Sequence, residues 1–160
     1  MTRWLSISGL VFALDQFTKH IVINNLYYGE RIDVLPFFQW VRFHNEGAAF
    51  SFLASAGPWK HWFFVTLGGL VAVYLIWELA RLKQEERHLG LVFSLILGGA
   101  LGNVCDRLLH GHVIDFIYFS YAGYSFPAFN IADMSLFFGA AIWIFFMIIE
   151  YRQGKDAHRS

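Results

Sequence analysis

Two aspartates, Asp115 and Asp133, are the residues of this sequence best suited to acid–base chemistry. Two carboxyl groups held about 3 Å apart share one proton, because both cannot be ionised at that separation. The ionised member of such a pair activates a water molecule, and the protonated member polarises a carbonyl group. Asp115 follows the apolar segment 89–109, and Asp133 lies at the start of the apolar segment 131–149, so the two are candidates for such a pair.

Asp133 also has a structural interpretation. The order Asn130-Ile-Ala-Asp133 resembles a helix N-cap followed by an acid at the third helical position, where the helix dipole favours an anion. The spacing does not separate a cap from a catalyst, and the two roles are compatible. If both hold, the dipole keeps Asp133 ionised and leaves the shared proton mainly on Asp115.

Further charges lie inside apolar segments, where each costs several kcal/mol. Asp15 and Lys19 have the i,i+4 spacing of an ion pair, and Asp106 is followed directly by Arg107. One interpretation is mutual neutralisation and snorkelling. In the other, Lys19 and Arg107 hold polar backbone or head groups in place. A Ser–Lys dyad with Lys19 as base is a further alternative, but only an arbitrary pairing with Ser51 would supply it.

Histidines near Asp115 raise the possibility of a metal site. His110 and His112 are two residues apart, and Cys105 lies nearby, but this spacing matches no closed zinc motif. Interfacial histidines and a cysteine used for packing explain the same residues. We therefore expect no metal and no other cofactor.

The composition places these residues in a membrane protein. Of 160 residues, 57% are apolar and 15% are charged, whereas a soluble domain has about 45–50% and about 25%. The net charge of zero excludes a basic nucleic-acid-binding surface. The length fits one domain, 1–160. Four stretches are long enough to cross a hydrocarbon core of about 30 Å, namely 4–26, 62–80, 89–109 and 131–149.

The Lys and Arg residues indicate the orientation of these spans. They are more numerous at the N-terminus, in the loop 81–88 and in the C-terminal tail than on the other side, which predicts cytoplasmic termini. Alternating helix directions then gather the polar residues in the outer half of the membrane. We place Asp115 beside them, in an outer loop. The residues that converge are Asp15, Lys19, Asn103, Asp106, Arg107, Asn130 and Asp133.

The outward-facing segment 27–61 is too polar to be a span. Partial alternation, interrupted by Pro36 and by an Asn45-Glu46-Gly47 turn, predicts two or three short strands. A plain covering loop is the alternative. Residues 117–126 could add another strand. On the third span, a small-residue stripe of Ser94, Gly98 and Gly102 permits close approach of a neighbouring helix.

Five motifs together resemble the lipoprotein signal peptidases, or signal peptidase II. They occur in the order of that family and reach from residue 15 to residue 133. Each motif alone is weak, but the set is highly specific. The motifs are DQFTK (15–19), NEGAAFSFL (45–53), GGALGNVCDR (98–107), GHVIDF (111–116) and FNIAD (129–133).

The resemblance implies a bacterial inner-membrane aspartic endopeptidase with four transmembrane helices and a small extracytoplasmic β-cradle with a mobile helical flap, within 27–61. Such enzymes cut prolipoproteins on the N-terminal side of a cysteine that carries diacylglycerol, and the peptide antibiotic globomycin blocks them. By resemblance, Asp115 and Asp133 are the catalytic dyad. We expect a monomer in contact with membrane lipid. The supporting polar residues match Asp15, Lys19, Asn45, Asn103, Asp106, Arg107 and Asn130.

Two other classes of function use the same residues. A small proton-coupled transporter could use Asp15, Asp115 and Asp133 as a relay, but a relay is expected to place charges at several depths. A structural membrane subunit could pair its charges with a partner protein. The gathering of charges at one side of the membrane favours the peptidase.

Overall fold

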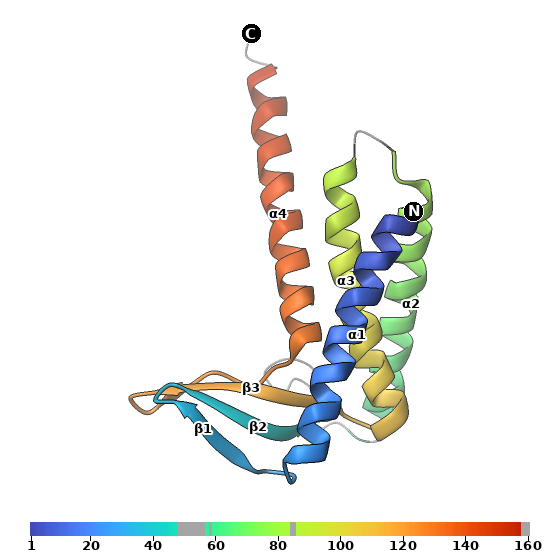
Figure 1. Cartoon of the computed structure of the whole chain (residues 1–160). Helices are drawn as coiled ribbons and strands as arrows, with labels where there is room; N and C mark the ends of the chain where they lie inside the picture. Colours follow the sequence, from blue (N-terminus) through green and yellow to red (C-terminus); the bar gives the residue numbers. More distant parts are fainter. Residues whose placement is uncertain (48–56, 58, 84–85, 158–160) are drawn as a thin grey trace.

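Figure 1 shows the computed structural model, which describes residues 1–47, 57, 59–83 and 86–157. Within these residues, helices run along one another and a small sheet lies at one end of them. The elements follow the chain as α1 (Thr2–Asn25), β1 (Arg31–Leu35), β2 (Phe38–Asn45), α2 (Trp59–Arg81), α3 (Arg87–His110), β3 (Val113–Tyr121), β4 (Tyr124–Ser125) and α4 (Ile131–Ala157).

Three of these helices are long and apolar enough to cross a membrane: α2, α3 and, over Ile131–Gln153, α4. A crossing needs about 20 mostly apolar residues. The helix α1 has 24 residues but carries Asp15 and Lys19 along with other polar residues, and it is not among the three. The structure therefore supports three of the four expected spans.

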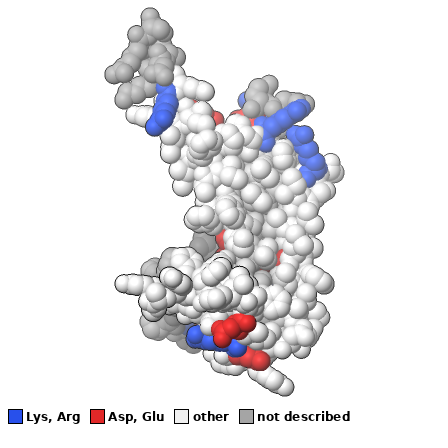
Figure 2. All heavy atoms as spheres, turned by 60° about the vertical axis from the view of Figure 1, so that its left-hand side comes forward, with Lys and Arg blue, Asp and Glu red and all other residues white. Residues whose placement is uncertain are grey.

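The helix α3 forms the centre of the bundle. In its most apolar stretch of 18 residues, 56% is buried inside the protein, whereas only 17% of the corresponding stretch is buried in each of α2 and α4. Leu97 and Val92 of α3 pack with Leu75 and Leu79 of α2 in the main apolar core. Large apolar side chains on the remaining faces of α2 and α4 stay exposed. On the face of the molecule that Figure 2 shows, charged side chains gather near the two ends, and few lie in between.

The small-residue stripe brings α1 against α3, as expected. A Cβ atom on Gly98 would lie 2.7 Å from the Ser8 carbonyl oxygen, and one on Gly102 would lie 2.5 Å from Asp15 Oδ2. Neither position has room for a larger residue. Gly99 makes a similar approach to α4, since its Cβ would lie 2.5 Å from the Ala132 carbonyl oxygen.

The sheet has the order β1-β2-β3-β4, and all its neighbouring strands are antiparallel. The described part of 27–61 thus forms two strands, which confirms the strand prediction there over the covering loop. The chain reverses at Pro36 and Phe37, since Leu35 pairs with Phe38. The predicted turn at Asn45-Glu46-Gly47 instead marks the end of β2. Residues 48–56 and 58 lie outside the described residues, so the possible third strand at 48–53 and the part of the expected flap that would fall there are not tested.

The expectation that Asp115 lies in a loop is wrong. The helix α3 ends at Gly111, whose φ of 80° gives a left-handed C-cap, and β3 begins only two residues later. Asp115 pairs with Phe43 of β2, so its backbone is fixed by a sheet. The predicted strand at 117–126 accordingly begins earlier, at Val113, because pairing with β2 extends it towards α3.

Candidate active site

Asp115 is held between two side-chain amides. Asn45, at the end of β2, donates from Nδ2 to Asp115 Oδ2 at 3.0 Å. Asn130, just before α4, donates from Nδ2 to Asp115 Oδ1 at 2.8 Å. The Asp115 residue is only 3% exposed, so these amides replace water around its carboxyl group.

Asp133 forms a reciprocal cap with Asn130. Asn130 Oδ1 accepts the Asp133 backbone N–H at 2.8 Å, and Asp133 Oδ2 accepts the Asn130 backbone N–H at 3.3 Å. This is the geometry of a capping box, so the capping interpretation of Asp133 is confirmed. The second oxygen, Asp133 Oδ1, accepts Nδ2 of Asn103 from α3 at 2.9 Å. Asn130 therefore contacts both aspartates and brings them to one place.

A second hydrogen bond fixes the orientation of each amide. The Oδ1 atom of Asn45 accepts the Gly47 backbone N–H at 3.0 Å. The Oδ1 atom of Asn103 accepts a hydrogen bond from Lys19 Nζ at 3.3 Å. The Oδ1 atom of Asn130 accepts the Asp133 backbone N–H in the helix cap. Because the amide oxygens are occupied in this way, the amide NH₂ groups must point at the carboxyl groups. Each of the four carboxyl oxygens of the two aspartates consequently accepts a hydrogen bond.

The environment of Asp115 favours its protonated form. The pKa of Asp115 is raised from 3.8 to about 7, mainly by burial and also by the nearby charge of Asp133, although the Asn45 and Asn130 hydrogen bonds act in the opposite direction. A group with this pKa exchanges its proton near neutral pH. The direction agrees with a shared proton that lies mainly on Asp115, which stays a prediction.

A buried ion cluster positions the backbone next to both aspartates. Asp15 Oδ1 accepts the backbone N–H of Ala132, directly before Asp133, at 2.8 Å. Asp106 Oδ2 accepts the backbone N–H of Ile114, directly before Asp115, at 3.0 Å. Lys19 Nζ lies 2.8 Å from Asp15 Oδ2 and 2.9 Å from Asp106 Oδ2. The predicted Asp15–Lys19 pair is thus confirmed, and it joins the strand and the helix that carry the candidate dyad.

Sequence reasoning missed the contribution of Gln16. Its Nε2 atom lies 2.9 Å from Asp106 Oδ1, 3.2 Å from Asp15 Oδ2 and 3.3 Å from the Gly102 carbonyl oxygen. This amide offers donors to two carboxylates that share a single ammonium group. Its position between Asp15 and Lys19 in the DQFTK motif was the only signal for it.

Arg107 does not pair with Asp106, contrary to one of the two interpretations. The partner of Asp106 is Lys19. Arg107 Nη2 donates to the Gly47 carbonyl oxygen at 2.7 Å, and its Nη1 donates to the Asn103 carbonyl oxygen at 3.3 Å. The guanidinium also lies 5.0 Å from the centroid of the Phe64 ring. Arg107 therefore holds polar backbone in place, as the other interpretation expected.

The histidines near Asp115 lie close together: His44 is in β2, His110 is at the end of α3, and His112 is directly before β3. The rings of His44 and His112 stack at 3.6 Å, and His110 lies 6.1 Å from His112. The pKa of His44 is lowered to about 4, mainly by burial and also by the nearby charge of His112. In the part of the chain that the structure describes, no three His, Cys, Asp or Glu side chains are placed to hold a metal ion together. Cys105 is half-buried on α3.

Comparison with known proteins decides the family. The family model described as Signal peptidase (SPase) II matches residues 7–149. The chain belongs to the signal peptidase II family. It is a hydrolase of the membrane that removes signal peptides from prolipoproteins, and the family is one of aspartic peptidases. The transporter alternative finds no support.

Relatives named lipoprotein signal peptidase cover most of the chain. The one from Alteromonas mediterranea is 50% identical over 142 residues, which are 89% of this chain and 78% of the relative. The one from Acinetobacter baumannii (strain ATCC 17978) is 43% identical over 157 residues, 96% of this chain and 89% of the relative. A solved structure of a bacterial membrane enzyme, determined by the in meso method at 2.3 Å resolution, is 33% identical in sequence and superposes with a TM-score of 0.84. The match covers 94% of this chain and 90% of the chain in that structure.

The close contact at Gly102 gives a first test of how this peptidase positions its polar residues. We expect Gly102→Ala to lower the free energy of unfolding by about 1–3 kcal/mol, because the new methyl group would overlap Asp15 Oδ2. The displaced carboxylate should also slow cleavage of a prolipoprotein. Thermal unfolding in detergent and a cleavage assay measure both effects.

Gly9→Ala is the matched control for this prediction. Gly9 also lies in a helix, α1, but a Cβ atom there meets nothing within 4 Å. Alanine has the higher helix propensity, so this variant should be as stable as the wild type or slightly more stable. Equal behaviour of the two variants would contradict the packing argument.

Proposed function

We propose that Asp115 and Asp133 form the catalytic dyad of this signal peptidase. The observation that carries the proposal is the position of Asn130, which donates to Asp115 Oδ1 and caps the helix through Asp133. A single side chain thereby brings the buried carboxyl group of Asp115, from β3, and the half-buried one of Asp133, from α4, to one place. The substrate is a diacylglyceryl-modified prolipoprotein, and the bond cut lies N-terminal to the lipidated cysteine.

The dyad acts on water and on the scissile carbonyl group together. Asp133, as carboxylate, takes a proton from water while the water oxygen bonds to the carbonyl carbon. Asp115 gives its proton to the carbonyl oxygen. When the tetrahedral intermediate breaks its C–N bond, Asp133 returns a proton to the leaving nitrogen and Asp115 recovers one from the intermediate. The pair ends with one proton, as it began, so this mechanism requires no metal.

The surrounding polar residues position the dyad. Asn45, Asn103 and Asn130 orient the carboxyl groups through the hydrogen bonds described above. The ion cluster of Asp15, Lys19 and Asp106 holds the backbone before each aspartate. Arg107 holds the carbonyl group of Gly47, near the end of β2.

We place the whole chain, 1–160, in the bacterial inner membrane as one domain with four spans. Support for α1 as the fourth span comes from its close packing against α3 through Gly98 and Gly102. Figure 1 shows the start of α1 and the end of α4 at the end of the bundle opposite the sheet. The Lys and Arg residues that dominate the predicted cytoplasmic side include Arg3 and Arg81. The sheet, the β-rich insertion 27–61 and the dyad then lie toward the extracytoplasmic side.

The same placement suits a lipidated substrate. Exposed apolar side chains on α2 and α4, such as Leu70 and Phe137, offer a lipid-facing surface for diacylglyceryl chains. We expect the peptidase to act as a monomer in contact with membrane lipid. Globomycin is expected to block it by binding at the dyad.

The raised pKa of Asp115 makes the proposed mechanism testable by pH. We expect kcat/KM to fall as pH rises through about 7, roughly tenfold per pH unit above that value, because Asp115 then loses the proton that it must donate. At low pH the rate should fall again as Asp133 becomes protonated. The profile is measured with a diacylglyceryl prolipoprotein in detergent.

Circular dichroism over the same pH range serves as the control, since the fold must persist while the rate changes. A rate that stays constant from neutral pH to pH 9 would contradict a dyad that shares one proton. The apparent values belong to the pair, because two interacting carboxyl groups titrate together.

A further inference from the structure

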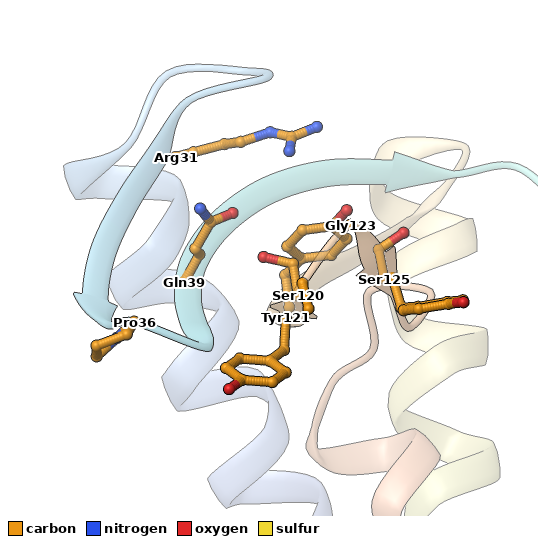
Figure 3. A pocket seen from close by; sticks show the side chains of 10 residues that line it. Arg31, Pro36, Gln39, Ser120, Tyr121, Gly123 and Ser125 are labelled. Carbon is orange, nitrogen blue, oxygen red and sulfur yellow. The ribbon is translucent and has the colours of Figure 1, made fainter.

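The sheet carries a polar pocket that the dyad does not use. Its volume is about 380 Å³, within the usual range for ligand pockets. Figure 3 shows Arg31 reaching in from β1, with the β3–β4 hairpin on the other side. The side chains that matter here are those of Arg31, Pro36, Tyr118, Ser120 and Ser125.

Arg31 is held in position by aromatic rings. Its guanidinium lies 5.0 Å from the centroid of the Phe43 ring and 5.1 Å from that of the Tyr118 ring. Stacking of this kind restrains the side chain while its N–H groups remain available. Within the described residues, the Arg31 side chain forms no ion pair and no hydrogen bond.

The acidic residues next to Arg31 in sequence are engaged elsewhere. Glu30 accepts the Tyr27 backbone N–H at 2.6 Å, and Asp33 accepts Nε2 of Gln39 at 2.6 Å. A restrained guanidinium without an acidic partner, beside the hydroxyl groups of Ser120 and Ser125, matches a carboxylate ligand that accepts paired hydrogen bonds.

Two of the residues that line the pocket, Tyr118 and Ser120, lie on the face of β3 opposite Asp115. Side chains alternate along a strand, so Asp115, Ile117 and Phe119 share one face of β3, and Tyr118 and Ser120 share the other. The dyad face is apolar farther out, where Trp40 pairs with Ile117. A lipid surface suits the apolar face, whereas the pocket face suits a polar polypeptide.

We propose that this pocket is a subsite for an acidic stretch in the mature part of the lipoprotein substrate. The inference rests on the dyad proposed above. From Asp115 to Gly123, at the sheet tip that lines the pocket, β3 and its turn span about 26 Å at about 3.3 Å per residue. Arg31 pairs with Val41, near the level of Ile117 on β3, so a chain that rounds this tip must also run back about 16 Å along the sheet and reaches Arg31 after roughly 12–16 residues. Carboxylates at those positions of the substrate then meet the guanidinium.

Two matched prolipoproteins test the subsite. One carries Asp and Glu from about the twelfth to about the sixteenth position after the cut, and the other carries Asn and Gln there. We expect wild-type kcat/KM to be about 3–10-fold higher for the acidic substrate, mainly through KM, because the contact is remote from the reacting bond. Added salt at about 0.5 M should reduce the preference, since the guanidinium is exposed.

Arg31→Gln should abolish this preference while leaving cleavage of the neutral substrate unchanged. Arg152→Gln, an exposed arginine at the far end of α4, is the matched control and should keep the preference. Equal wild-type cleavage of the two substrates would overturn the subsite alone. Failure to cleave either substrate would overturn the proposed dyad chemistry and the subsite with it.

The membrane environment provides the remaining arm of the test. The assay is repeated in bicelles with and without anionic phospholipid. If Arg31→Gln changes the response to anionic lipid but not the response to substrate charge, the pocket binds a head-group phosphate and the proposal is wrong.

Discussion

Asp133→Asn is expected to reduce kcat for prolipoprotein cleavage by about 10³–10⁵-fold, the range seen when an acid–base residue of a concerted group is lost. Asparagine can still accept the Asn130 backbone N–H through its amide oxygen, so the start of α4 should keep its cap. The variant removes the carboxylate that, in the proposed mechanism, takes the proton from water. Loss of activity without loss of fold is therefore the expected result.

Asp115→Asn should reduce kcat to a similar extent for the complementary reason. Its amide cannot donate the acidic proton to the carbonyl oxygen, although it occupies the same volume between Asn45 and Asn130. Because the two aspartates act together, the double variant should be little worse than either single one. Additive losses would contradict a shared mechanism.

Asp33→Asn is the matched control for both variants. Asp33 is exposed on β1, and asparagine preserves an acceptor for Gln39. With a neutral substrate this variant should cleave at the wild-type rate. Addition of EDTA to the wild type tests the metal alternative, and we expect no loss of activity. Near-normal cleavage by a correctly folded Asp115→Asn or Asp133→Asn variant would refute the dyad.

Lys19→Met is the second change with a large expected effect, and it acts on stability. Lys19 is 2% exposed and contacts the carboxylates of Asp15 and Asp106, which are 0% and 1% exposed. Without the ammonium group, two buried carboxylates lose their shared counter-charge. Removal of one partner from a buried ion pair typically costs 3–5 kcal/mol. We expect a loss of about that size, measured by chemical unfolding in detergent.

Activity should fall with stability in this variant, because the cluster positions the backbone before each aspartate. A triple variant, Asp15→Asn, Lys19→Met and Asp106→Asn, separates charge from shape. It removes all three charges together and should recover part of the lost stability. If it is no more stable than Lys19→Met alone, uncompensated charge is not the cause.

Glu46→Gln provides the surface comparison. Glu46 forms an ion pair with Lys60 at 2.9 Å, but its side chain is 64% exposed. Exposed pairs contribute about 0–1 kcal/mol, so this variant should unfold at nearly the wild-type denaturant concentration. A cost equal to that of Lys19→Met would show that burial does not decide the effect.

Local sequence signals predicted much of this structure. Long apolar runs located the helix ends to within three residues, except that α4 continues about eight residues beyond the expected end at 149. The spacing from Asn130 to Asp133 predicted the cap at the start of α4, because a capping box involves only four consecutive residues. The stripe containing Gly98 and Gly102 predicted a close helix contact for a similar reason, since helical periodicity alone places those residues on one face.

The features that sequence reasoning missed depend on contacts between distant segments. Asp115 lies in a strand because β3 pairs with β2, some seventy positions away along the chain. Asp106 binds Lys19 rather than its neighbour Arg107, because α1 lies against that part of α3. Neighbouring residues on a helix point in different directions, so adjacency in sequence was a poor guide there.

The double role of Asn130 links the chemistry of this enzyme to the order in which its chain is made. The residue belongs to the last of the helices described here, and the same side chain caps that helix and contacts Asp115. A nascent chain that ends before residue 130 carries one aspartate of the proposed dyad and lacks the other. On the proposed mechanism, hydrolytic capacity arises only after the start of α4 has been synthesised, and a shorter nascent chain cannot cleave the precursors around it.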